Sequence, residues 1–130
     1  MSRSPIVLAL AAFAVALLAV PAALASGGSD RSIRVQGTCT QQSTSKLKLS
    51  SDDRGIEVEF EVDQNVNGDT WSVRLRDNGM TFFKGTRVTQ PPSGSFTVQR
   101  RTDNLDGTDQ ITARAANQST GEVCRASLKI

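Results

Sequence analysis

The residues most able to do chemistry in this sequence are the side-chain oxygens of the stretch DQNVNGD, residues 63–69. Oxygens at alternate positions, followed by Gly68, are typical of the first half of a calcium loop, in which a tight turn directs them at one ion. The ligands that this pattern predicts are Asp63, Asn65, Asn67 and Asp69. Position twelve of such a loop should be acidic but is Arg74. A polar turn between two strands is therefore the favoured interpretation, and a calcium-stabilised module is the alternative.

A second candidate site is a set of basic residues at outward-facing positions of three predicted strands. They are Arg74, Arg76, Arg114, Arg125 and Lys129. Acidic residues are expected near them only at strand ends, at Asp77 and Glu122. Such a face would attract an anionic cell-envelope polymer, an acidic polysaccharide or an acidic protein. A solvated basic face is the simpler interpretation, since salt screens exposed charges beyond roughly 8 Å.

The sequence provides no arrangement that predicts catalysis. It has no histidine, so no serine has the usual base to activate it, and the commonest zinc ligand is missing. A hydrolase with paired carboxylates would have to use Asp52, Asp53, Glu57, Glu59 or Glu61. These acids are more typical of a turn and a solvated strand face. We expect no enzyme and no cofactor besides the calcium alternative, and we keep a small secreted hydrolase or hydrolase inhibitor as a third hypothesis.

The beginning of the chain is typical of a secretory signal peptide. One arginine precedes an apolar run at residues 6–20, and an Ala-x-Ala pattern ends at Ala25. That run is short for a bilayer span of roughly 20 residues. We therefore expect a secreted protein with no membrane anchor after cleavage. The predicted organisation is a signal peptide at 1–25, a flexible leader at 26–31 and one domain at 32–130.

The two cysteines, Cys39 and Cys124, lie near opposite ends of that domain. An even pair in an exported protein predicts one disulfide, with two free thiols as the alternative. Removing Arg3 from the 15 basic residues leaves 14 against 13 acidic residues. This near balance argues against a nucleic-acid partner.

Apolar residues alternate with polar ones from Ser32 onward, and turn signals separate the runs. This pattern predicts a sandwich or barrel of seven or eight strands with no helix. The expected strands are residues 32–39, 45–50, 56–62, 70–76, 80–88, 93–101, 109–115 and 121–130. Asn78-Gly79 predicts a tight hairpin, and NQST, residues 117–120, a second one. Pairing of the second and third strands would place lysines opposite glutamates.

Within NLDGTDQITARA, Leu105 stands four residues before Asp109, and Ile111, Ala113 and Ala115 follow at every second position. This resembles the immunoglobulin-like pattern of a leucine plug, an aspartate turn and the penultimate core strand. Bacterial immunoglobulin-like and fibronectin-like modules are similar. Alanines stand where antibody domains carry the corner tyrosine and the cysteine, so the usual inter-sheet disulfide is absent. The resemblance implies a sandwich whose disulfide joins neighbouring first and last strands, and an up-and-down barrel is the alternative.

The sequence therefore predicts a single immunoglobulin-like antiparallel β-sandwich of seven to eight strands, closed by one disulfide. Its expected role is non-catalytic binding or structural support in the extracellular space or cell envelope. We expect a monomer, with an anionic envelope polymer or acidic protein as the partner. Arginine outnumbers lysine 11 to 4, which is typical of proteins from GC-rich genomes and favours a GC-rich bacterial source.

Overall fold

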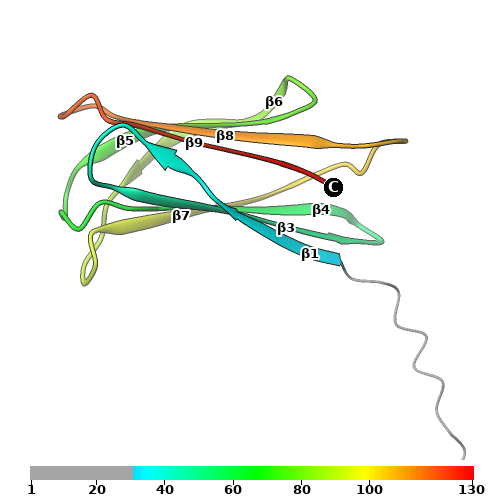
Figure 1. Ribbon diagram of the computed structural model, residues 1–130, viewed down its shortest axis with the longest axis horizontal. Helices are drawn as coiled ribbons and strands as arrows, with labels where there is room; N and C mark the ends of the chain where they lie inside the picture. The colour runs from blue at the N-terminus through cyan, green and yellow to red at the C-terminus, as the bar shows by residue number, and fades with distance from the viewer. Residues whose placement is uncertain (1–30) are drawn as a thin grey trace, which may run out of the picture.

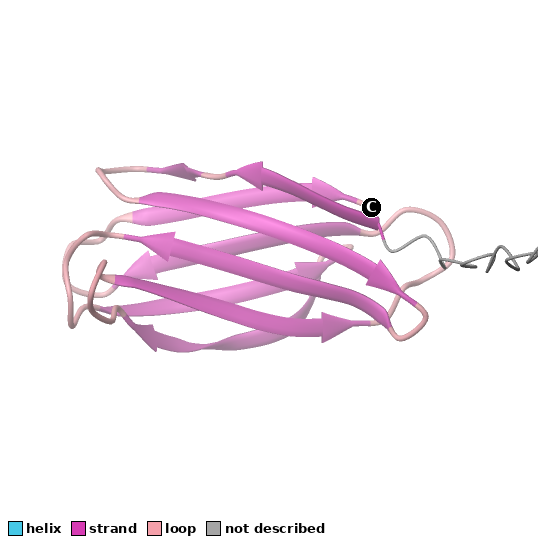
Figure 2. Ribbon diagram, turned by 90° about the horizontal axis from the view of Figure 1, so that it is seen from below, coloured by secondary structure: helices cyan, strands magenta, loops and turns pink. Residues whose placement is uncertain are grey.

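The computed structural model describes residues 31–130. The predicted signal peptide and all but the last residue of the predicted leader lie outside the described residues. Two antiparallel sheets face each other and form a sandwich (Figures 1 and 2). The strands are β1 (Arg31–Gln36), β2 (Thr38–Cys39), β3 (Thr44–Asp52), β4 (Gly55–Asp63), β5 (Thr70–Asp77), β6 (Met80–Val88), β7 (Ser95–Thr102), β8 (Gln110–Asn117) and β9 (Val123–Lys129). Among residues 31–130 there is no helical segment with the length and hydrophobicity needed to span a bilayer.

The two sheets are built from short hairpins joined by connections that cross between the layers. The four-stranded sheet has the order β1-β3-β4-β7, and the five-stranded sheet has the order β2-β9-β8-β5-β6. Hairpins join β3 to β4, β5 to β6 and β8 to β9. This arrangement confirms the predicted β-sandwich and is compatible with an immunoglobulin-like one. It has nine strands rather than seven or eight, because the segment 32–39 divides into β1 and β2, which pair in different sheets.

Gly37 is the point at which the chain passes from one sheet to the other. Its N–H donates a 2.9 Å hydrogen bond to the carbonyl oxygen of Ser45. A Cβ at this position would lie 2.6 Å from the carbonyl oxygen of Arg125, and a backbone atom cannot rotate away. Glycine is therefore required by the close approach of two backbone segments.

The crossing at Gly37 places Cys39 directly opposite Cys124 in β9. The two sulfurs are bonded, 2.09 Å apart. The predicted disulfide is thus confirmed, and it joins the second strand, not the first, to the last. A disulfide persists in an oxidising environment, which agrees with the expected extracellular location.

The core lies between the sheets and follows from the alternation of apolar and polar residues along each strand. Its buried apolar side chains are Leu47, Leu49, Ile56, Val58, Phe60, Val62, Trp71, Val73, Leu75, Phe96, Val98, Ile111, Ala113, Ala115, Cys124 and Ala126. Trp71 is fully buried, with its ring centroid 6.0 Å from that of Phe96. The apolar residues that alternate with polar ones along β3, β4, β5 and β7 are all in this core, as are Ile111, Ala113 and Ala115 on β8.

The predicted leucine plug is wrong, because Leu105 is 52% exposed. It lies in the polar connection between β7 and β8, which turns away from the core as the chain changes sheets. Asp109 is fully buried instead. Its backbone N–H and C=O each form a 3.0 Å hydrogen bond with Ile130. The aspartate turn therefore fixes the end of β9, without an apolar plug.

Removal of the disulfide should be costly. The variant carrying Cys39→Ala and Cys124→Ala should lose about 4 to 5 kcal/mol of unfolding free energy, because its unfolded chain regains the freedom of a loop closed across 85 positions. Denaturant unfolding followed by tryptophan fluorescence measures this loss. The reduced native protein should match the variant. If the oxidised protein and the variant have equal stability, the disulfide adds nothing to the pairing of β2 with β9.

Candidate anion-binding face

Four basic residues form a row across the outer face of the five-stranded sheet. Arg74 on β5 lies opposite Lys84 on β6 and opposite Arg114 on β8. Arg114 in turn lies opposite Arg125 on β9. We call Lys84, Arg74, Arg114 and Arg125 the cation row. Since neighbouring strands are roughly 4.8 Å apart, like charges lie side by side on four consecutive strands. Like charges directly opposite each other are destabilising, so this row costs folding free energy.

No carboxylate of residues 31–130 forms an ion pair with the cation row. The two acids that the sequence places nearest to this face, Asp77 and Glu122, are 6% and 3% exposed. Glu122 accepts hydrogen bonds from the backbone N–H groups of Gln41 (2.9 Å) and Ser43 (3.0 Å), and from the Ser43 hydroxyl. It therefore holds the loop between β2 and β3 and leaves the basic face unneutralised.

All five basic residues predicted from the sequence lie on this sheet. Three of them belong to the cation row. Arg76 is in the neighbouring row, opposite Thr112, and Lys129 is opposite Gln110 near the end of β9. The prediction missed Lys84. Its position depends on the register of the β5–β6 hairpin, which shifts at Leu75 and Arg76.

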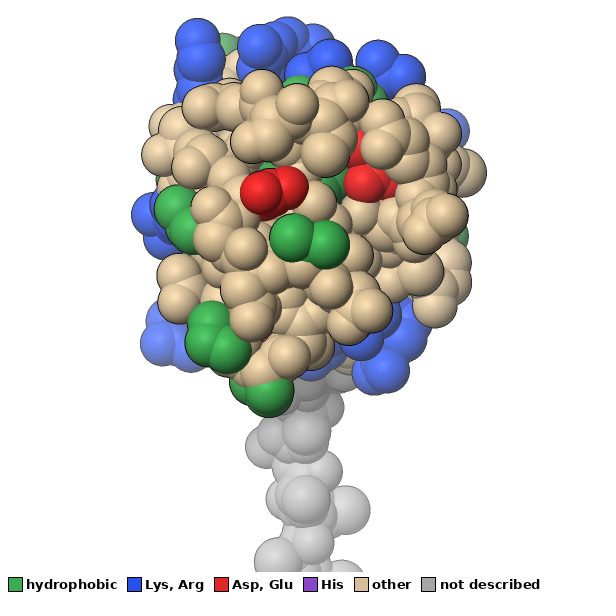
Figure 3. Space-filling model, turned by 90° about the vertical axis from the view of Figure 1, so that its left-hand side faces the viewer, with side chains coloured by type: hydrophobic (Ala, Val, Ile, Leu, Met, Phe, Trp, Pro, Cys, Tyr) green, Lys and Arg blue, Asp and Glu red, His purple; other side chains and the backbone are tan. Residues whose placement is uncertain are grey.

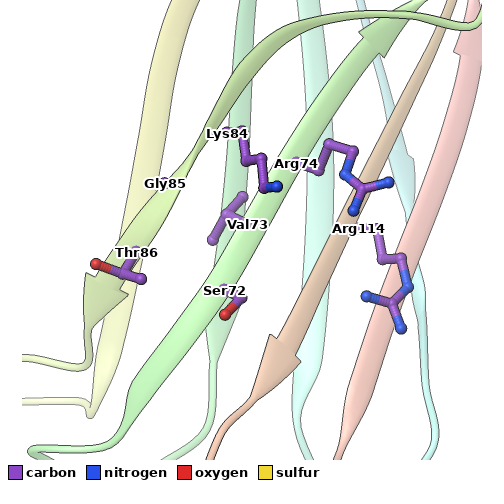
Figure 4. A pocket seen from close by; sticks show the side chains of 7 residues that line it. All are labelled: Ser72, Val73, Arg74, Lys84, Gly85, Thr86 and Arg114. Carbon is purple, nitrogen blue, oxygen red and sulfur yellow. The ribbon is translucent and has the colours of Figure 1, made fainter.

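Two shallow hollows adjoin the cation row. The first has a volume of about 330 Å³ and is lined by Ser72, Val73, Arg74, Lys84, Gly85, Thr86 and Arg114. In Figure 4, Lys84, Arg74 and Arg114 lie side by side on adjoining strands, with Ser72 and Thr86 beyond them. The second has a volume of about 190 Å³ and is lined by Arg74, Arg76, Thr112, Ala113, Arg114 and Arg125. Arg74 and Arg114 border both hollows, so the two are adjacent.

The outer face of the four-stranded sheet is different, because its outward-facing glutamates, Glu57, Glu59 and Glu61, are each paired with a cation. The ion pairs are Lys46 with Glu61 (3.7 Å), Lys48 with Glu59 (3.2 Å), and Arg101 with Asp52 (3.0 Å) and Glu57 (3.3 Å). The predicted opposition of lysines and glutamates is confirmed. The Arg101 guanidinium and the N–H of Arg54 lower the pKa of Asp52.

Four of the five acids considered for a hydrolase are thus held in these ion pairs. Asp53 is exposed in the turn between β3 and β4. Each of the paired carboxylates already has a cation as its neighbour. These ion pairs join β3, β4 and β7 and stabilise the four-stranded sheet.

The predicted calcium loop connects β4 to β5, and its last carboxylate belongs to a network of amides. Asp69 Oδ2 accepts hydrogen bonds from Gln64 Nε2 (2.6 Å) and Asn117 Nδ2 (3.0 Å). Gln64 Oε1 accepts a 3.0 Å hydrogen bond from Trp71 Nε1. The Asn117 amide, and then the Gln64 amide, lower the pKa of Asp69. This network satisfies the indole N–H and joins the loop to the turn after β8.

The remaining predicted ligands do not form a tight acidic cluster. Asp63 Oδ1 accepts a hydrogen bond from the N–H of Asn65 (3.1 Å) within its own turn. In residues 31–130 the one group of three cysteine or carboxylate side chains with ligand atoms within 4.8 Å is Cys39, Glu122 and Cys124, and both sulfurs are in the disulfide. Calcium binding by Asp63, Asn65, Asn67 and Asp69 stays a prediction.

Figure 3 views the sandwich from the end at the left of Figure 1. Lys and Arg side chains gather along the upper edge, on the side of the five-stranded sheet, and others lie at the lower corners. Two acidic patches lie between them, on a surface that is mostly polar and uncharged.

A hollow of about 500 Å³ at the β2–β3 and β4–β5 loops is lined by Gln41, Gln42, Ser43, Gln64, Val66, Thr120 and Glu122.

Two further acids, which the sequence analysis did not select as a site, are buried together at strand ends. Asp77 Oδ2 accepts a 3.1 Å hydrogen bond from the Thr102 hydroxyl, whereas its buried Oδ1 has no partner. Asp109 is a close neighbour of Asp77 and accepts a hydrogen bond from the Asn78 amide (3.4 Å). Burial raises the pKa of Asp77 above its ordinary value of 3.8, and the charge of Asp109 raises it further.

Comparison with protein-family models, with curated proteins and with solved structures finds no match for this chain.

Asp77 should make stability fall as pH rises. Its pKa is raised in the folded state, so its favourable contribution is complete below about 3.8 and is lost as the pH passes the folded pKa. The Asp77→Asn variant does not lose stability in this way. The unfolding free energy of the variant minus that of the native protein should therefore increase from pH 4 to pH 7.5. Denaturant titrations across that range measure the difference. Asp106→Asn, in the exposed part of the nearby loop, is the control, and a pH-independent difference for Asp77→Asn would contradict the assignment.

The hydrogen bonds of Asp69 lead us to expect no effect of calcium on thermal stability. The melting temperature should be the same in millimolar calcium and in chelator, because the carboxylate is already bound by two amides. Differential scanning calorimetry measures this. A higher melting temperature in calcium, abolished by Asp63→Asn, would support the calcium-stabilised alternative.

Proposed function

We propose that this protein is a secreted, non-catalytic binding module that holds an anionic partner on the cation row. The observation that carries the proposal is the register of β6, β5, β8 and β9, which aligns Lys84, Arg74, Arg114 and Arg125 without a carboxylate beside them. On the other sheet, the three glutamates of β4 are each paired with a cation. An unpaired row costs stability, and an anionic partner would offset that cost.

The chemistry of the row suits carboxylate, sulfate or phosphate groups. Three of its four members are arginines, whose planar guanidinium groups can donate two parallel hydrogen bonds to such an anion. Arg114 and Arg125 are exposed, and Arg74 is half-buried between its neighbours. Their donors are therefore accessible from solvent along most of the row.

A secreted location is supported by the disulfide and by the predicted signal peptide at residues 1–25. An immunoglobulin-like topology is supported by the pairing of β4 with β7 and of β5 with β8 and then β9. In immunoglobulin domains the corresponding pairs are strands B with E and strands C, F and G. In such modules function resides in the surface and not in the fold, which is consistent with a binding role.

Reversal of charge in the row should weaken binding to anionic surfaces. The variant with Arg74→Glu and Arg114→Glu should bind isolated cell wall about tenfold more weakly and leave a carboxylate resin at lower salt, because ion pairs become repulsive contacts. Sedimentation binding and salt-gradient chromatography measure these effects.

The matched control carries Arg31→Glu and Arg34→Glu on β1, in the other sheet. It has the same net charge as the first variant, and both of its sites are exposed. It should keep most of the binding. An equal loss in the two variants would show that net charge matters and the cation row does not.

A further inference from the structure

We infer that the anionic partner is a linear acidic polysaccharide, which crosses the strands of the five-stranded sheet with about one sugar ring per strand. This inference depends on the proposed function and specifies the chemistry of its ligand. It comes from the shape of the two hollows, from the hydroxyl groups that line them and from the spacing of the cations.

The two hollows are adjacent, and together they lie across four strands of the sheet. The first extends over β6, β5 and β8, and the second over β5, β8 and β9, with Arg74 and Arg114 between them. A linear chain can follow this path in contact with all four strands. A folded acidic protein would instead need a matching surface of roughly 800 Å² on each side, and two small hollows do not favour such a contact.

The lining combines cations with uncharged hydroxyl groups. Ser72 and Thr86 lie in the first hollow, and Thr112 lies in the second. Guanidinium groups can bind the carboxylate of a sugar acid through two hydrogen bonds, and hydroxyl side chains can pair with the ring hydroxyls.

The spacing of the charges matches such a chain. The row presents one cation per strand, at intervals of roughly 4.8 Å. An extended glycan with one carboxylate on every ring repeats its charge at an interval of the same order. Four cations therefore predict a site for four rings.

Binding of oligogalacturonates of two to eight rings, measured by isothermal titration calorimetry at fixed low salt with chelator present, tests this inference. The association constant should rise about two- to fivefold for each ring up to four, and then level off. Oligomers with methyl-esterified carboxyl groups should not bind. The variant with Arg74→Glu and Arg114→Glu should lose binding at every length.

Hydroxyl variants separate sugar recognition from charge. Thr86→Val and Thr112→Val together should weaken binding of the tetramer about fivefold and leave binding of polyglutamate unchanged, because only the sugar uses these hydroxyls. Ser50→Ala with Thr97→Ala, on the outer face of the other sheet, is the control and should change neither.

The outcomes distinguish this inference from the proposed function. Polyglutamate or an oligonucleotide of equal charge could bind as tightly as oligogalacturonate. That result would overturn the polysaccharide inference but leave the proposed anion-binding function intact. An affinity that does not rise beyond two rings would also overturn the polysaccharide inference. If no polyanion binds, both the polysaccharide inference and the proposed anion-binding function are wrong.

Discussion

The structure depends on the passage of the N-terminal chain from one sheet to the other. β1 pairs with β3, and two residues later β2 pairs with β9, so one short segment closes the same side of both layers. The backbones approach so closely that Gly37 cannot carry a side chain. The disulfide between Cys39 and Cys124 and the hydrogen bonds of Glu122 then hold the crossing in place. A small sandwich gains from such a covalent closure because its core is limited in size.

This closure also determines what the surface can do. β9 is covered on one side by β2 and paired on the other with β8, so the face of the five-stranded sheet is continuous from Arg125 to Lys84. Regular pairing across those strands brings the cations into line. The four-stranded sheet uses the same geometry to pair lysines with glutamates. The glutamates of one face are therefore neutralised by cations, whereas the cation row on the other face has no carboxylate partner. An anionic ligand would contribute most to stability at the cation row.

Much of the fold was predictable from local patterns. The alternation of residues identified nearly every strand, the Asn78-Gly79 turn adopts positive φ angles of 47° and 85° as a tight hairpin requires, and the core side chains were assigned to the correct face. The predictions that failed involve contacts distant in sequence. The division of residues 32–39 at Gly37 depends on the backbone of Arg125, and the turn at Asp109 is held by Ile130 where a Leu105 plug was predicted. Neither neighbour is visible in a local window of sequence.

The sequence by itself determined the strands, their buried faces and the presence of a single disulfide, because side chains alternate with a period of two along any strand. It also indicated the outward positions of Arg74, Arg76, Arg114, Arg125 and Lys129, but not that of Lys84. The tertiary structure alone decided that Lys84, Arg74, Arg114 and Arg125 share one row and that Asp77 and Glu122 are buried away from it. Register and strand order are set by hydrogen bonds between distant segments of the chain. The cations therefore become neighbours only when these strands pair.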